Sequence, residues 1–265
     1  MRDPEKRREA ALRKELEAVV REEEKLMTKA EKRLPPAWKE KLEKMVPPKV
    51  YEGLETAFCK AFSLVFREGS LIVEKSMKKE DLEADHKVQD YAFQLTGRRK
   101  DLKKLQKMAK QSDLINLSVT TVEGVGLGLL GIGLPDIVLF LATLLRGIYE
   151  MVLSYGFTYD STFEKYVILK IMENALTMGE NWGEKNAEID SLVYHGEKEI
   201  SEEEFEAQLE RTASAFAVDM LLLKFIQGFP LAGLAGGVAN PVYYRKVMKY
   251  AEIKYRKRYL FSQVR

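Results

Sequence analysis

Apolar residues recur at spacings of three and four along most of the chain, with charged residues between them. Such spacing places the apolar side chains on one face of an α-helix. The clearest cases run from Val50 to Phe66 and from Ile137 to Val152. Leu114 to Val122 has the composition of a strand, but helical patterns surround it, so we interpret it as a buried continuation of a helix. The pattern therefore predicts an all-α fold.

Capping and breaking residues divide this pattern into separate helices. Asp3 before Pro4 starts the first helix, and Ser201 with Glu204 three residues later forms a capping box. The expected helices span about residues 4–34, 38–45, 50–68, 80–95, 98–110, 135–155, 161–178, 201–227 and 241–265. On one side of the helix at residues 80–95 lie Leu82, Val88, Tyr91, Ala92 and Leu95.

The first 35 residues differ in composition from the rest. Leu12, Leu16 and Val19 make a thin apolar stripe, and most of the other positions are charged. We therefore divide the chain into a charged N-terminal amphipathic helix, residues 1–35, and a single multi-helix domain, residues 36–265. A thin stripe favours docking onto that domain. An arm that binds a protein partner or forms a coiled coil is the alternative.

Two glycine-rich apolar segments interrupt the domain, one from Gly124 to Gly133 and one from Gly228 to Val238. Each is followed by a proline, Pro135 or Pro241, that can begin a new helix. Small residues let two backbones approach closely, so we expect both segments to pack at the core. The first also matches G-x-G-x-x-G, but it lacks the β-α-β context of a dinucleotide site, so no nucleotide cofactor is expected.

The apolar run from Gly124 to Leu145 is long enough to cross a bilayer. However, Asp136 falls near its middle, where a charge costs about 3 kcal/mol or more. This position favours a buried helical hairpin over a stable transmembrane span. Shallow or conditional contact with a membrane is the intermediate case.

The chain has 43 lysines and arginines against 41 aspartates and glutamates, which gives a formal net charge of +2. Acids dominate residues 180–210, and bases dominate two helices. These basic faces fit an anionic membrane surface, while pairing with the acidic region or simple solvation is the alternative. The near-zero net charge argues against a nucleic-acid partner. The basic faces contain Arg98, Arg99, Lys103 and Lys107 on one helix and Arg245, Lys249 and Arg256 on the other.

The chain carries no known catalytic or metal-binding motif. Glu83 and His86 have the Glu-x-x-His spacing of iron-binding helical bundles, but no second copy accompanies them. His86 is therefore expected to be an ordinary surface residue, and no metal, cofactor or catalytic residue is expected. Cys59 is the only cysteine, so no disulfide can form within the chain. Without a signal peptide, a cytoplasmic protein is the default expectation, with peripheral membrane contact.

Five short blocks follow one another in a fixed order along the chain. They run from Gly124 to Asp136, Leu145 to Glu150, Tyr155 to Phe157, Pro230 to Asn240 and Ala251 to Leu260. In these ordered blocks the sequence resembles the EcsC family. The resemblance begins near Pro36 and leaves the charged N-terminal helix as an addition. It implies a mostly helical domain with a transport-associated or envelope-associated role, because the family is named for a protein encoded beside ABC-transporter subunits. It implies no established activity and no catalytic residues.

Two functions are compatible with these features. The favoured one is a non-enzymatic accessory or scaffold protein that contacts a membrane surface or a membrane transporter. The alternative is a helical domain that binds a lipid or small molecule, with or without enzyme activity, in a pocket between the glycine-rich segments. The polar residues expected in that pocket are Glu123, Asp136, Tyr155 and Asn240. For Asp136 and Asn240, helix capping or first-turn stabilisation is the favoured explanation.

Overall fold

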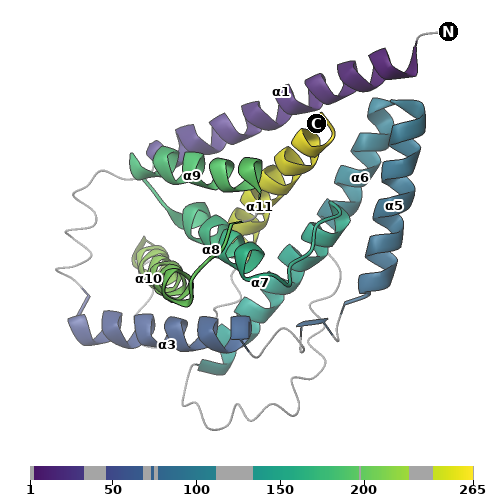
Figure 1. Cartoon of the computed structure of the whole chain (residues 1–265). Helices are drawn as coiled ribbons and strands as arrows, with labels where there is room; N and C mark the ends of the chain where they lie inside the picture. The colour runs from purple at the N-terminus through teal and green to yellow at the C-terminus, as the bar shows by residue number, and fades with distance from the viewer. Residues whose placement is uncertain are drawn as a thin grey trace.

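The computed structural model of the chain describes residues 3–32, 46–67, 73–74, 77–111, 134–196, 198–226 and 241–264 (Figure 1). These residues form helices and contain no strand, which confirms the all-α prediction. The long helices are α1 (Pro4–Glu31), α3 (Pro48–Arg67), α5 (Lys79–Thr96), α6 (Arg99–Gln111), α7 (Leu134–Ser154), α8 (Thr162–Leu176), α9 (Asn181–His195), α10 (Glu202–Ile226) and α11 (Pro241–Ser262).

Capping residues set several of these boundaries. The Asp3 carboxylate accepts a hydrogen bond from the Glu5 amide at 3.1 Å, with Pro4 as the first residue of α1. The predicted capping box before α10 is present: Ser201 Oγ accepts from the Glu204 amide, and Glu204 Oε2 accepts from the Ser201 amide, both at 3.1 Å. These contacts satisfy amide groups that a helix leaves unpaired at its first turn.

The core is built around α7, α8 and α11, which the other helices cover. Helix α8 packs against α9, α10 and α11, and α7 packs against α3, α5, α6 and α11. Figure 1 shows α1 lying across one side of the molecule, over α9 and α11, with α5 and α6 side by side at one edge. The charged N-terminal helix therefore docks onto the rest of the chain, as its apolar stripe predicts.

The apolar face expected between residues 50 and 66 packs against α10. Phe62 and Phe216 contact each other edge to face with ring centroids 5.3 Å apart, and Phe58 lies 5.8 Å from the same Phe216 ring. Phe66 and Phe205 extend this contact along the two helices. Each aromatic pair adds about 0.5–1.5 kcal/mol to the gain from burial alone.

Helix α7 is a core helix. Among the described residues, one stretch, Ile137–Ser154 within α7, is long and apolar enough to cross a membrane, with a mean hydropathy of 1.8. Yet 72% of that stretch is buried inside the protein. Gly147 lets α11 approach, since a Cβ atom there would lie 2.5 Å from Tyr244 Oη. The expected helix start at Pro135 and the expected end near Gly156 are both confirmed.

Several predicted features lie outside the described residues. They are the short helix near Trp38, the segment from Leu114 to Val122, and the two glycine-rich segments. The expectation that the glycine-rich segments pack at the core therefore stays a prediction.

Candidate functional site

Helices α5 and α6 form an antiparallel hairpin whose turn fixes the orientation of both helices. Gly97 ends α5 with φ of 59°, and its backbone lies so close to α1 that a Cβ atom would be 2.5 Å from the Pro4 carbonyl oxygen. Thr96 Oγ1 donates a hydrogen bond to Asp101 Oδ2 at 2.6 Å and closes the turn. Phe93 of α5 and Leu102 of α6 are buried. These contacts define which side of each helix faces the core.

The solvent side of α6 is basic. Lys100, Lys103 and Lys107 are exposed and form no ion pair with the described residues. Arg98 and Arg99 are also exposed, although Arg99 Nε lies 2.5 Å from Glu15 of α1. The basic face predicted for this helix is therefore present, and Arg98, Lys100, Lys103 and Lys107 on it form no ion pair with any carboxylate that the structure describes.

The solvent side of α5 carries an apolar stripe. Val88, Tyr91 and Leu95 are 60%, 65% and 60% exposed, and their spacing places them on one helix face. The sequence places these three residues on one side of the helix, and the structure shows that this part of the helix faces solvent. Helix α5 has two apolar faces, and the one containing Phe93 meets the core. The stripe lies on the same hairpin as the α6 lysines.

His86 is not an ordinary surface residue. Its Nδ1 lies 3.0 Å from the Ser154 carbonyl oxygen at the end of α7, and its ring contacts Tyr259 of α11 edge to face. A carbonyl oxygen only accepts, so Nδ1 carries the proton in this contact. Gly156, with φ of 80°, leaves room for the imidazole. Among the described residues no group of three or more His, Cys, Asp or Glu side chains is placed to hold a metal ion.

The basic residues of α11 divide into exposed and buried ones. Arg245 and Lys249, near its start, are exposed. Arg256 is only 3% exposed, and its guanidinium lies 2.9 Å from Glu22 of α1 and 3.4 Å from Glu252. The assignment of Arg256 to an exposed membrane-facing surface is therefore wrong. The physical reason is that α1, α8 and α9 surround this part of α11: Arg256 pairs with Glu22 of α1, Lys257 with Asp190 of α9, and Arg258 with Glu164 of α8.

Two lysines of α11 form a buried ionic cluster with α1 and α9. The Nζ atoms of Lys254 and Lys257 each lie 2.6 Å from Glu23 and 2.6 Å from Asp190. Burial lowers the pKa of Lys254, whose side chain has no exposed surface. Burial acts the same way on Lys257, but hydrogen bonds with Asp190 and Glu23 outweigh it and raise the pKa of that ammonium. Asp190 belongs to the acidic region, so pairing between basic and acidic segments is confirmed here.

Only one residue of the expected pocket has a described side chain. Tyr155 is buried and donates a hydrogen bond to Glu252 Oε1 at 3.3 Å. Burial raises the pKa of the Tyr155 hydroxyl and of the Glu252 carboxyl. Glu123, Asn240 and the side chain of Asp136 lie outside the described residues, so the pocket stays a prediction. Glu252 could have been singled out from the sequence, because it is the only acidic residue in a basic helix.

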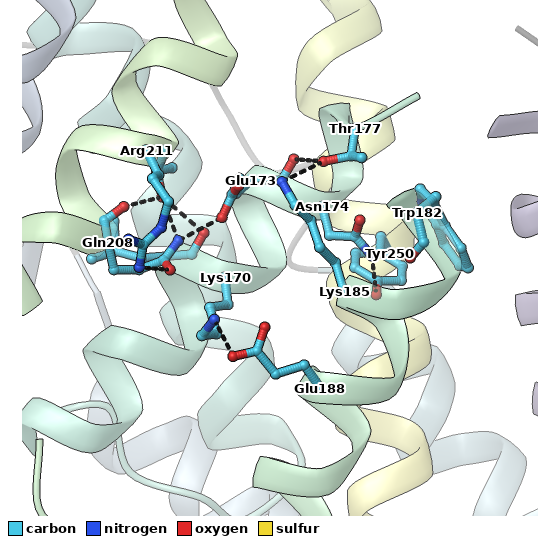
Figure 2. A network of polar contacts seen from close by, with 12 residues as sticks. Lys170, Glu173, Asn174, Thr177, Trp182, Lys185, Glu188, Gln208, Arg211 and Tyr250 are labelled. Carbon is cyan, nitrogen blue, oxygen red and sulfur yellow. Dashed lines mark hydrogen bonds and ion pairs between the residues drawn. The ribbon is translucent and has the colours of Figure 1, made fainter. Parts of the chain in front are cut away.

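A second polar network joins α8, α9, α10 and α11 (Figure 2). Buried Glu173 accepts hydrogen bonds from Lys185 and, at 2.7 Å, from Gln208 Nε2. Burial alone would raise the pKa of Glu173, but these two partners outweigh it and lower that pKa. Asn174 donates to Tyr250 Oη at 2.9 Å, and Tyr250 donates to Asn186 at 2.7 Å. Each member is held by neighbours from other helices, so this network stabilises the helix arrangement.

The comparisons with known proteins identify a family. A model of the EcsC protein family matches residues 10–260. No curated protein and no solved structure matches the chain. The match begins inside α1, so it includes most of the helix that the sequence resemblance left out as an addition.

Proposed function

Because the chain belongs to the EcsC protein family and this membership carries no activity, we propose a function from the surface of the molecule. The protein is a non-enzymatic accessory protein that binds an anionic membrane surface through the α5–α6 hairpin. We call its contact region the hairpin surface: Val88, Tyr91 and Leu95 of α5, with Lys100, Lys103 and Lys107 of α6. The observation that supports the proposal is the presence of both residue classes on one exposed hairpin.

The lysines and the apolar residues of the hairpin surface have separate roles at a lipid surface. A lysine near an anionic leaflet contributes about 1 kcal/mol, and the attraction falls off within a Debye length. An apolar side chain at the boundary of the headgroups and acyl chains leaves water, which contributes up to about 1.5–3 kcal/mol for full burial. We place this contact at the cytoplasmic leaflet, where anionic lipids are enriched. A membrane transporter in the same bilayer would then be within reach of the protein.

Vesicle flotation tests the proposal with two variants of the hairpin surface. The variant Lys103→Gln/Lys107→Gln should bind vesicles of phosphatidylcholine with about 30% phosphatidylglycerol some 10- to 30-fold more weakly. The variant Tyr91→Ser/Leu95→Ser should also bind more weakly. It should keep its free energy of unfolding within about 0.5 kcal/mol, since both residues are exposed.

The matched control is Lys49→Gln/Lys60→Gln, which removes two exposed lysines of α3 and leaves the hairpin unchanged. This control should bind vesicles as the wild type does, apart from a small effect of net charge. If the wild-type protein stays with the soluble fraction in low salt, the membrane proposal is wrong. If the control weakened vesicle binding as much as Lys103→Gln/Lys107→Gln does, net charge alone would account for the binding. The proposal that the α5–α6 hairpin makes the contact would then be wrong.

A further inference from the structure

Helix α1 is held to the rest of the chain by a contact that is unusually polar. Its buried apolar residues are few, with Leu12 and Val19 the largest. Two of its other buried residues are the carboxylates Glu15 and Glu23. Burying an ion pair removes both charges from water, so its net contribution to docking is small even when the geometry is good. Helix α1 is therefore held less firmly than its length suggests.

The inward-facing acids of α1 each meet a base on α6 or α11. Glu15 pairs with Arg99, Glu22 with Arg256, and Glu23 with both Lys254 and Lys257. These bases belong to the two helices whose basic faces the sequence analysis identified. The carboxylates of α1 thus lie where anionic groups of a ligand would lie if α1 were absent.

The charge balance beneath α1 depends on these acids. Without α1, the bases Lys110, Lys254, Arg256 and Lys257 pair, among the described residues, only with Asp190 and Glu252, which leaves an excess of two positive charges. Glu22 and Glu23 of α1 neutralise that excess.

The fit of α1 to Arg256 is incomplete. Arg256 Nη2 pairs with Glu22 at 2.9 Å, and Nη1 lies 3.4 Å from Glu252. The Nε of this buried guanidinium has no hydrogen-bond partner among the described residues. A guanidinium can donate two parallel hydrogen bonds to a phosphate, and such bonds to an anion are stronger than those between neutral groups. Arg256 therefore has unused capacity for an anionic ligand.

We propose that Lys254, Arg256 and Lys257 form a second anion-binding surface, which α1 covers with Glu22 and Glu23, and that phosphate headgroups of an anionic membrane displace α1 to reach it. The choice of ligand rests on the proposed function. Lys110 of α6 lies 3.6 Å from Glu252 of α11, so the covered surface borders the basic face of α6. Release of α1 would extend one basic surface from α6 onto α11.

Hydrogen–deuterium exchange on the full chain tests this proposal directly. Vesicles with about 30% phosphatidylglycerol should raise the exchange rate of α1 amides at least about tenfold. The amides of α8 serve as the internal reference and should not change, and neither helix should respond to vesicles of phosphatidylcholine alone. Vesicle binding that leaves α1 fully protected would overturn the covered surface and keep the proposed function.

Variants of α1 give a second, independent result. Glu22→Gln/Glu23→Gln should raise α1 exchange without vesicles and should tighten vesicle binding several-fold. The matched control is Glu17→Gln, because Glu17 is exposed and, within the described part of the chain, pairs only with Arg13 and Arg21 of the same helix. Equal tightening by the control would reduce the effect to net charge and overturn the proposal. An equal rise in the amide exchange rates of α1 and α8 would also overturn the proposal, because it would mean that α1 detaches only when the whole molecule unfolds.

The two proposals fail in different ways. If the wild type ignores anionic vesicles but Glu22→Gln/Glu23→Gln binds them, the hairpin function is wrong and the covered surface stands. If neither protein binds, both proposals are wrong.

Discussion

At the scale of single residues, the best-defined titratable group is Glu173. It is buried on α8, and its carboxylate accepts hydrogen bonds from Lys185 and Gln208. Those partners lower its pKa below the ordinary value of 4.5. A carboxyl group with a lowered pKa in the folded state stabilises the fold above its unfolded pKa. That contribution is lost as the pH falls through the folded value.

We predict that Glu173→Gln lowers the free energy of unfolding at neutral pH by about 1–3 kcal/mol. The range allows for solvent screening of Lys185, which is partly exposed. The deficit should shrink as the pH falls below 4.5, because the wild type then loses the same charge. Urea denaturation across this pH range measures both effects.

The control for this prediction is Glu188→Gln. Glu188 pairs with Lys170 at 2.7 Å, but its side chain is about half exposed, so its loss should cost less than about 1 kcal/mol. A cost at Glu173 that equals the cost at Glu188 at every pH would contradict the proposed role of burial.

At the scale of helices, two glycines inside helices have opposite surroundings. A Cβ atom at Gly147 of α7 would lie 2.5 Å from Tyr244 Oη and 3.2 Å from Met248 Cε on α11. A Cβ atom at Gly53 of α3 would have none of the described residues within 4 Å. Glycine is about 1 kcal/mol less favourable than alanine within a helix.

We predict opposite signs for the same substitution at these two sites. Gly53→Ala should raise the free energy of unfolding by about 0.5–1 kcal/mol through backbone entropy alone. Gly147→Ala should lower it by about 1–2 kcal/mol, because Tyr244 and Met248 must shift and the contact of α7 with α11 loosens. Thermal or urea unfolding measures the free energy of unfolding of each variant relative to the wild type. Stabilisation at Gly147 would mean that the two side chains move aside freely.

The helices themselves follow closely from local signals in the sequence. The capping box of Ser201 and Glu204 and the break at Gly156 act within a few residues, so the sequence alone indicates them. The choice of inner face was harder for α5. That helix has apolar residues on two faces, and periodicity cannot tell which of them meets the core. The exposure of Val88 and Tyr91 was therefore visible only in the structure.

The buried charges also could not be predicted from local sequence patterns, because their partners lie far away in the chain. Lys254 and Glu23 are 231 residues apart in the chain, yet they share a hydrogen bond in the interior. Charge in a sequence suggests solvent exposure, as it did for Arg256, and local patterns do not reveal a distant partner that makes burial tolerable. Part of the candidate site, the basic face of α6, was predictable, because its lysines repeat on one face of a short helix. The covered surface on α11 was not.

At the scale of the whole molecule, exposed and buried charges should respond differently to salt. The lysines of the hairpin surface are exposed, whereas the cluster of Lys254, Lys257, Glu23 and Asp190 is largely shielded from water. The Debye length falls from about 10 Å to about 3 Å between about 0.1 M and about 1 M salt, and buried pairs are screened much less than exposed ones.

We therefore predict that about 1 M sodium chloride releases the protein from anionic vesicles while its midpoint of thermal unfolding changes by only a few degrees. Flotation and circular dichroism on the same samples measure the two quantities. The Tyr91→Ser/Leu95→Ser variant should be released at lower salt than the wild type, because the lysines alone would hold it at the lipid surface. Parallel loss of binding and of folded structure would mean that salt disrupts the buried cluster. Release would then report unfolding instead of screening at the hairpin surface.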